Sequence, residues 1–269
     1  MSAAAGAMSE GEFRDTLARA EKLIDEVNAN VATLFDRADR AMRLLPPGLS
    51  HTLADTLVAL RDLIARFFEE YAKIVHNPGW PFGLMAAADD WTSRIGGPIS
   101  QLSAQLSPDQ MRTDNHWRGR AADAYAAVLP SQQKAIDAIK ATTDAIDTNL
   151  TKTAYGIFAL WAGVILALVG FVAELAVEAG AAATVVGAPP AAAGAGLSTA
   201  KVIGLVVACV ALFVTFVGTI VDSVTTLNQS LHSDTAFPGG AWPRSTTTDF
   251  DDGSLSDGDT TDWRIKSDD

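Results

Sequence analysis

Two long segments without a charged residue constrain this chain more than any other feature of its sequence. Residues 154–173 and 202–221 are each twenty residues long, and neither contains Asp, Glu, Lys or Arg. As a helix, each would be about 30 Å long, which is the thickness of the hydrocarbon core of a bilayer. The rest of the chain is too small to cover two helices that are apolar on all sides. The pattern predicts two transmembrane helices within residues 153–227, and the alternative is a helical hairpin buried in a soluble core.

Charge divides the chain into three parts around these segments. Residues 1–152 contain 16 Lys or Arg and 20 Asp or Glu, residues 153–233 contain 1 and 3, and residues 234–269 contain 3 and 9. With a net charge of −12 and no basic run interleaved with aromatics, the chain is not expected to bind nucleic acid. The first twenty residues carry acids and lack a continuous apolar stretch, so no secretory signal peptide is expected there. Lys134, Lys140 and Lys152 flank the first span, whereas the loop between the spans offers only Lys201, which weakly favours cytoplasmic termini.

Residues 9–152 predict a four-helix, coiled-coil-like bundle after a flexible start at residues 1–8. Ser9 and Glu12 have the spacing of a capping box at the start of the first helix. The apolar positions of the first two helices alternate by four and three residues, in the seams Phe13, Leu17, Ala20, Ile24, Val27, Val31, Leu34, Ala38, Ala41 and Leu45, and Leu53, Leu57, Leu60, Ile64, Phe67, Tyr71 and Ile74. Such a seam shows which face is buried but not what covers it, so packing within the chain is the default and packing on another protein is the alternative.

Prolines and glycines set the expected ends of these helices. Residues 46–48, Pro-Pro-Gly, end the first helix, and Ser50 is the expected cap of the second. A third helix over residues 84–106 is interrupted at Gly96-Gly97-Pro98, where a kink or a change of phase is expected. The fourth helix continues its seam to Leu150 with nothing to break it before the first span. With no strand-like alternation or glycine-rich phosphate loop, the fold class is all-α.

The turn before the fourth helix carries a family resemblance. Trp117-Arg118-Gly119 is followed by Arg120-Ala-Ala-Asp-Ala-Tyr125 and a long heptad helix. This sequence resembles the Trp-x-Gly (WXG) superfamily of type VII, or ESX, secretion, and the order of hairpin and apolar segment is similar to the larger ESX secretion-associated proteins of actinobacteria. The resemblance covers residues 82–152 and implies a helical hairpin with Trp117, Gly119 and Tyr125 at its turn. It also implies a helical protein partner of the secretion pathway, or self-association.

The export signal found in many such proteins, Tyr-x-x-x-Asp/Glu, does not occur here. Tyr71, Tyr125 and Tyr155 are followed four residues later by Val75, Leu129 and Ala159. Two expectations follow for localisation. Either the protein is exported by type VII secretion with a partner that supplies the signal, or it stays in the membrane as a resident helical scaffold.

Small residues repeat along both apolar segments. They are Gly156, Gly163 and Gly170 in the first and Gly204, Ala208, Ala211 and Gly218 in the second. Small faces allow helices to approach closely in lipid, so the two spans are expected to pack on each other or on copies of themselves. The alternative is that these residues only reflect the usual composition of apolar spans.

The charges beside the spans suggest one ion pair. Glu174 lies just after the first span and Lys201 just before the second, so a hairpin would bring them together at one membrane face. A pore former that inserts the hairpin is a third functional reading. It is less favoured than anchoring in membrane lipid, because neither span contains an ionisable group to line a lumen.

The sequence predicts no enzyme, no cofactor and no metal site. The four histidines lie far apart without the spacing of a zinc site, and the only cysteine, Cys209, falls inside the second span. Residues 228–269 are rich in Ser, Thr, Asp and Gly and are expected to form a disordered acidic tail.

Overall fold

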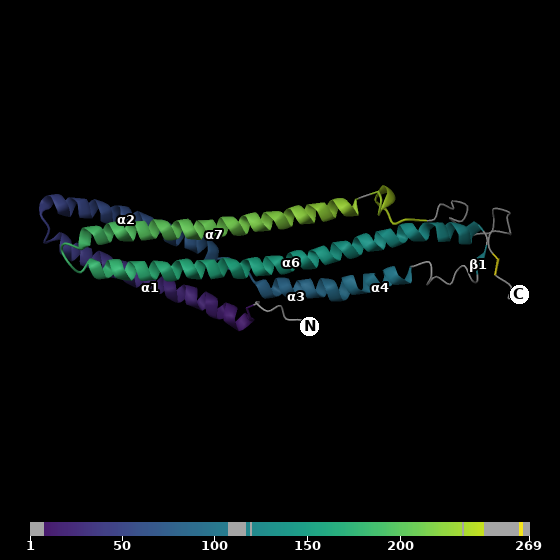
Figure 1. Cartoon of the computed structure of the whole chain (residues 1–269), viewed down its shortest axis with the longest axis horizontal. Coiled ribbons are helices and arrows are strands. Elements are labelled where there is room, and N and C mark those ends of the chain that lie inside the picture. Colours follow the sequence, from purple (N-terminus) through teal and green to yellow (C-terminus); the bar gives the residue numbers. More distant parts are fainter. Residues whose placement is uncertain (1–7, 107–116, 119, 233, 245–263, 266–269) are drawn as a thin grey trace. The chain divides into compact units, whose positions relative to one another are not determined.

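The computed structural model describes residues 8–106, 117–118, 120–232, 234–244 and 264–265, and Figure 1 shows that long helices dominate these residues. The all-α class is confirmed. The main helices are α1 (Glu10–Met42), α2 (Pro47–Val75), α3 (Pro81–Trp91), α4 (Gly97–Gln105), α6 (Arg120–Ala181) and α7 (Ala188–Leu231). As expected, α6 runs without a break from the heptad region into the first apolar segment.

The ends of α1 and α2 follow from local hydrogen bonds and prolines. Ser9 caps α1: its hydroxyl accepts from the Glu12 N–H at 3.3 Å, and the Glu12 carboxylate accepts from the Ser9 N–H at 2.7 Å. The cap expected at Ser50 is wrong, because α2 already begins at Pro47. Proline suits the first helical position, where its fixed φ is helical and no N–H is needed. Ser50 instead lies in the first turn, and its hydroxyl donates to the Pro47 carbonyl.

A single π-helical turn, Thr92–Gly96, joins α3 to α4. It lies directly before Gly97 and Pro98, where the sequence predicts a kink or a change of phase. A π turn contains one extra residue per turn, so it shifts the face that the following helix presents. The interruption is therefore a change of phase within a continuous helical segment.

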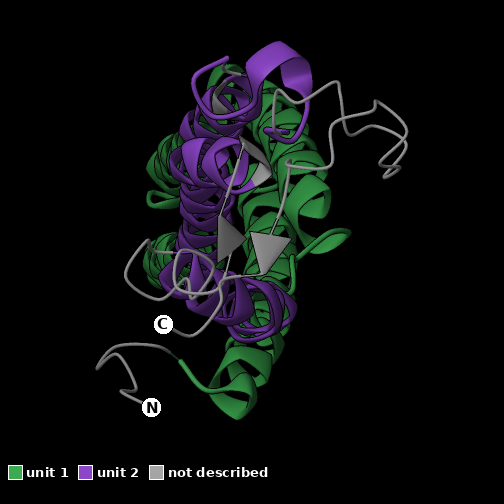
Figure 2. Ribbon diagram, turned by 90° about the vertical axis from the view of Figure 1, so that its right-hand side faces the viewer, with its two compact units in different colours: residues 1–82, 153–218 green, residues 83–152, 219–269 purple. Residues whose placement is uncertain are grey.

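The described contacts divide the chain into two compact units, shown in green and purple in Figure 2. The first contains residues 1–82 and 153–218, and the second contains residues 83–152 and 219–269. This grouping differs from the expected bundle of residues 9–152, because α1 and α2 belong to one unit with the apolar segments. The physical reason is that those segments offer the most apolar surface for the two seams to bury.

The first unit has a core formed by one face of each of its helices. The seven seam positions predicted for α2 are its buried residues, and in α1 Leu23 is buried where the seam predicted Ile24. The largest side chains that are almost completely buried come from α1, α2, α6 and α7: Phe13, Leu34, Leu53, Leu60, Phe67, Trp161, Leu168, Leu175 and Val206. The amphipathic and the fully apolar helices therefore share one core.

The structure describes part of the tail that the sequence predicts to be disordered from residue 228. Helix α7 continues to Leu231, and a short 3-10 helix, Pro238–Gly240, follows. The β1 segment, Trp117–Arg118, pairs antiparallel with β2, Arg264–Ile265, in a two-residue ladder. The rest of the tail, and all of the expected flexible start except Met8, lie outside the described residues.

We expect Phe13→Ala to lower the free energy of unfolding by about 3–5 kcal/mol, the usual cost of truncating a fully buried aromatic. Phe13 is 0% exposed, and its ring contacts three other aromatic rings. The matched control is Val58→Ala on α2, where the side chain is 59% exposed, and this change should cost less than 1 kcal/mol. Urea unfolding of the full chain followed by circular dichroism measures both. Equal costs would contradict the described core.

Candidate functional site

Helices α6 and α7 are long and apolar enough to cross a membrane. They differ in how far the protein covers them: 44% of the most apolar stretch of α6 is buried, against 11% of that of α7. We therefore treat these two apolar segments, residues 153–181 and 188–218, as the candidate functional site and call them the apolar hairpin. Both segments lie in the first unit.

Helices α1 and α2 cover one face of α6. The rings of Phe13 on α1 and Phe158 on α6 meet edge to face, with centroids 5.6 Å apart. The rings of Phe67 on α2 and Phe171 on α6 do the same at 5.1 Å. Arg37 on α1 donates a hydrogen bond of 2.6 Å to the carbonyl of Ala179, in the last turn of α6. The cover therefore extends along the whole first apolar segment.

The turn between α2 and α3 also packs against α6. The indole N–H of Trp161 donates to the Pro78 carbonyl at 2.8 Å, so this completely buried tryptophan has its polar atom satisfied. Gly79, the residue after Pro78, has a φ of 75°, and a Cβ there would lie 3.0 Å from Cδ1 of Ile157. The turn therefore needs glycine for its backbone conformation and for its close approach to α6.

Two of the predicted small residues lie where α6 meets α7. A Cβ atom on Gly156 would lie 2.7 Å from Cε1 of Phe216, and one on Gly163 would lie 3.0 Å from Sγ of Cys209. These glycines of α6 thus make room for larger side chains of α7. The two apolar segments pack on each other through this face.

The other predicted small residues do not take part in that contact. Among the described residues, no atom lies within 4 Å of a Cβ built on Gly170, Gly204 or Gly218. Ala208 and Ala211 are exposed. The small-residue stripe of α7 therefore faces away from α6, and bulky residues such as Phe213 and Phe216 form the contact instead.

The structure brings Glu174 and Lys201 together at the start of the closed end of the apolar hairpin, residues 174–201, which we call the tip. The ammonium of Lys201 donates to the Glu174 carboxylate at 2.5 Å, which links α6 to α7. This hydrogen bond, with a second one from Ser198, lowers the pKa of Glu174 from its ordinary value. Both side chains are partly exposed, so the pair contributes at most about 1 kcal/mol to stability.

Glu178 lies one turn further along α6, and its pKa is shifted in the opposite direction. Burial raises its pKa, and the nearby negative charge of Glu174 raises it further. Its carboxylate lies over Gly194 of α7, where a Cβ would come within 2.2 Å of Oε1. The tip therefore combines an ion pair with a carboxyl group that is easier to protonate than usual.

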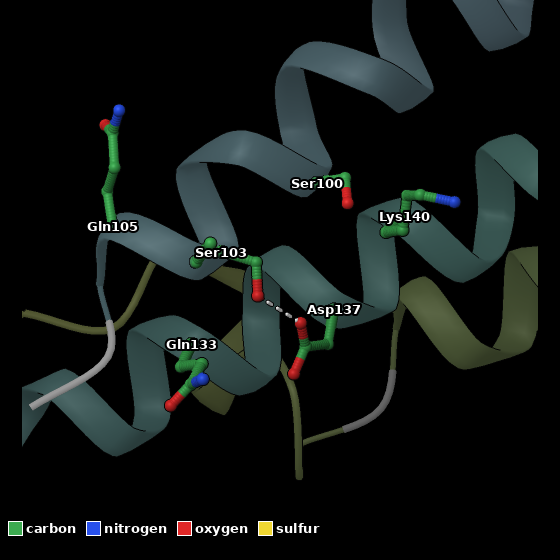
Figure 3. Close-up of a pocket in the computed structure, with 7 residues that line it drawn as sticks. Ser100, Ser103, Gln105, Gln133, Asp137 and Lys140 are labelled. Carbon is green, nitrogen blue, oxygen red and sulfur yellow. Dashed lines mark hydrogen bonds between the residues drawn. The ribbon is translucent and has the colours of Figure 1, made fainter. Parts of the chain in front are cut away.

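The second unit contains residues 83–152, the part of the chain to which the family resemblance applies. Ser103 on α4 donates to Asp137 on α6 at 2.6 Å, as Figure 3 shows. Seven residues earlier, a Cβ on Gly96 would lie 3.2 Å from Oγ1 of Thr143. The partner of Gly96 therefore comes later in α6 than the partner of Ser103, so the two helices run antiparallel. An open polar groove between them is lined by Ser100, Ser103, Gln105, Gln133, Asp137 and Lys140.

The predicted turn residues are only partly described. Trp117 lies in β1, Gly119 is outside the described residues, and Tyr125 is half-buried near the start of α6. In the same unit, the Gln132 side chain donates to the Pro243 carbonyl at 3.1 Å, and Trp242 and Pro243 line a depression over Ala124 and Ala127. Trp242 and Pro243 are apolar residues within an acidic tail, and they make this contact with α6. The acidic composition of the tail did not predict it.

Sequence reasoning missed the residues by which α1 and α2 hold α6. Arg37 and Phe171 carry no motif, and a heptad seam does not name its partner. One signal was available: Arg37 directly precedes the seam residue Ala38, so it lies at the edge of a buried face. No family model, curated protein or solved structure matches the chain.

We expect Gly163→Leu to weaken the contact between α6 and α7, because the new side chain would collide with Cys209. Cys209 is the only cysteine, so its rate of reaction with a thiol reagent reports on the contact directly. The rate should rise in Gly163→Leu. The control Gly170→Leu, which meets no described atom, should react as the wild type does. An unchanged rate in Gly163→Leu would refute the contact.

The two tip carboxyls should give opposite dependences of stability on pH. Glu178 has a raised pKa, so its contribution to stability is present below the ordinary value of 4.5 and is lost as pH rises through the raised pKa. Glu174 has a lowered pKa, so its contribution is present above 4.5 and is lost as pH falls through the lowered pKa.

At pH 7 we therefore expect Glu178→Gln to raise the urea midpoint and Glu174→Gln to lower it. Both shifts should be small, because water screens these partly exposed groups. Midpoints measured between pH 4 and pH 7 for the wild type and both variants test the signs. Shifts in the same direction at pH 7 would show that the tip is arranged differently.

Proposed function

We propose that this chain is a membrane-integral helical protein associated with type VII secretion, acting by helix–helix recognition and membrane anchoring. The observation that carries the membrane part is the apolar hairpin, in whose second helix only 11% of the most apolar stretch is buried. A charge-free helix of this length is stable in hydrocarbon, where its backbone hydrogen bonds are satisfied internally. In water, its exposed apolar surface would be a liability.

The secretion part rests on the resemblance at Trp117, Gly119 and Tyr125. The antiparallel arrangement of α4 and α6 is compatible with the helical hairpin that this resemblance implies. The open polar surface of that hairpin offers a second helix hydrogen-bonding groups such as Gln133 and Asp137. Recognition of a helical partner, or of another copy of the chain, would use this part of the protein.

A resident membrane scaffold that is not exported is the second candidate. It is favoured by the sequence pattern at the three tyrosines, none of which is followed four residues later by an acid. In this case the same apolar hairpin would hold the protein in the inner membrane, and the second unit would recruit cytosolic helices.

Fractionation of cells with and without a working type VII ATPase separates the two candidates. We expect the protein in carbonate-washed membranes, and outside the inner membrane only when the ATPase works. Trp117→Ala should reduce this export, whereas the control Leu44→Ala, which truncates a 72% exposed apolar side chain of the first unit, should leave it unchanged. Carbonate-resistant retention in both strains would instead identify a resident scaffold. A protein found only in soluble fractions would contradict membrane anchoring itself.

A further inference from the structure

The face of α6 that α1 and α2 cover is also a face that would meet lipid in a bilayer. It includes Phe158 and Phe171, both of which are buried and belong to the charge-free segment 154–173. In the structure their rings meet Phe13 in the seam of α1 and Phe67 in the seam of α2. Hydrocarbon would satisfy them equally well, because lipid tails are as apolar as the seam residues.

Helices α1 and α2 cannot accompany the apolar hairpin into hydrocarbon. Thirteen of the 33 residues of α1 and seven of the 29 residues of α2 are charged. Placing even one such charge at the centre of a bilayer costs about 2.5–3.5 kcal/mol on insertion scales. The seams of α1 and α2 are buried on α6, so their charged faces point outward, where lipid would lie.

We propose that the α1–α2 hairpin and bilayer hydrocarbon compete for the same face of α6, so that the chain has a covered form and a membrane-inserted form. This proposal rests on the proposed membrane function and adds to it a lipid-binding surface and the element that masks it. In the covered form, α1 and α2 shield α6 from water. In the inserted form, they have separated from α6 and lie outside the hydrocarbon.

The uncovered face of α7 makes the first contact with lipid. Large apolar side chains are exposed along it: Leu205, Val207, Leu212 and Val214 are between 43% and 72% exposed. They lie within the charge-free segment 202–221, which matches the thickness of the hydrocarbon core. This surface is apolar along its length, so it fits acyl chains rather than a charged protein helix. Lipid can therefore bind α7 before α1 and α2 leave α6.

The cover is held in part by bonds that are easily exchanged for water. Arg37 donates to the Ala179 carbonyl, one of the last carbonyls of α6, which a helix leaves without an internal partner. Asn30 donates a long bond of 3.5 Å to the Val172 carbonyl. The buried hydroxyl of Tyr71 on α2 has no hydrogen-bond partner among the described residues, and opening of the cover would hydrate it. These features favour a cover that can be released.

A reversible cross-link between the cover and α6 tests the competition. In a full-length Cys209→Ala background, Phe67→Cys and Phe171→Cys replace two side chains whose rings lie 5.1 Å apart, and a reducible bis-thiosulfonate linker joins them. The protein is mixed with phosphatidylcholine vesicles, which carry no net charge to repel a chain of net charge −12. Vesicle flotation after a carbonate wash measures the inserted fraction. The cross-linked chain should not insert, and reduction of the linker should restore insertion.

A single substitution tests the cover without a cross-link. Arg37→Ala removes the hydrogen bond to Ala179 and should speed insertion on the order of tenfold, the factor expected for losing one hydrogen bond to a charged group. The matched control is Arg40→Ala on the same helix, because Arg40 pairs with Asp36 at the exposed surface. Its rate should equal that of the wild type. Equal rates for Arg37→Ala and Arg40→Ala would count against the cover.

The outcomes separate this inference from the proposed function. If the cross-linked chain inserts as fully as the reduced chain, the cover does not block insertion and the inference fails while membrane anchoring stands. If neither the wild type nor the reduced chain ever becomes carbonate-resistant, in vesicles or in cells, the proposed membrane function fails and the inference fails with it. Insertion that depends on reduction supports both.

Discussion

The first unit depends on the burial of one face of α6 under the seams of α1 and α2. Phe13, Phe67 and Trp161 are almost completely buried there, and each contacts a residue of another segment of the unit. Because the hydrophobic effect has no direction, the same apolar face is stabilised by a protein seam or by lipid. The charged outer faces of α1 and α2 decide which environment is possible for the whole assembly. In water, α1 and α2 remain packed on α6. In the proposed inserted form, they separate from α6.

The sequence predicted faces well and partners poorly. All seven seam positions of α2 are buried, and the capping box places the start of α1 correctly. Both follow from local rules: a period of 3.6 residues fixes a face, and a side chain three residues away fixes a cap. The choice of α6 as the partner depends on contacts between residues more than a hundred positions apart, such as Phe67 and Phe171. The periodicity of a sequence contains no information about contacts between such distant residues.

The apolar hairpin shows the same limit at the level of single glycines. Gly156, Gly163 and Gly170 recur every seven residues, yet only the first two lie against α7. On α7, Gly204 and Gly218 face away from α6, and the contact is made by Cys209 and Phe216. Spacing identified a small face on each helix, but a small face on one helix can pack against large side chains on the other. In this interface, larger side chains of α7 pack into the space beside small residues of α6, and the small residues of the two helices do not face each other.

The distribution of charge also determines which part of the chain could cross a bilayer. For the proposed two-span anchor, either the tip of the apolar hairpin or the flanking segments must pass through the hydrocarbon. Residues 1–152 carry 36 charged side chains, whereas the tip carries Glu174, Glu178 and Lys201. The structure already pairs Glu174 with Lys201, and burial raises the pKa of Glu178 and so favours its neutral form. Since the cost of crossing grows with every unpaired charge, a chain that inserts as proposed would pass the tip through the hydrocarbon and keep both flanking segments on the side from which the hairpin enters.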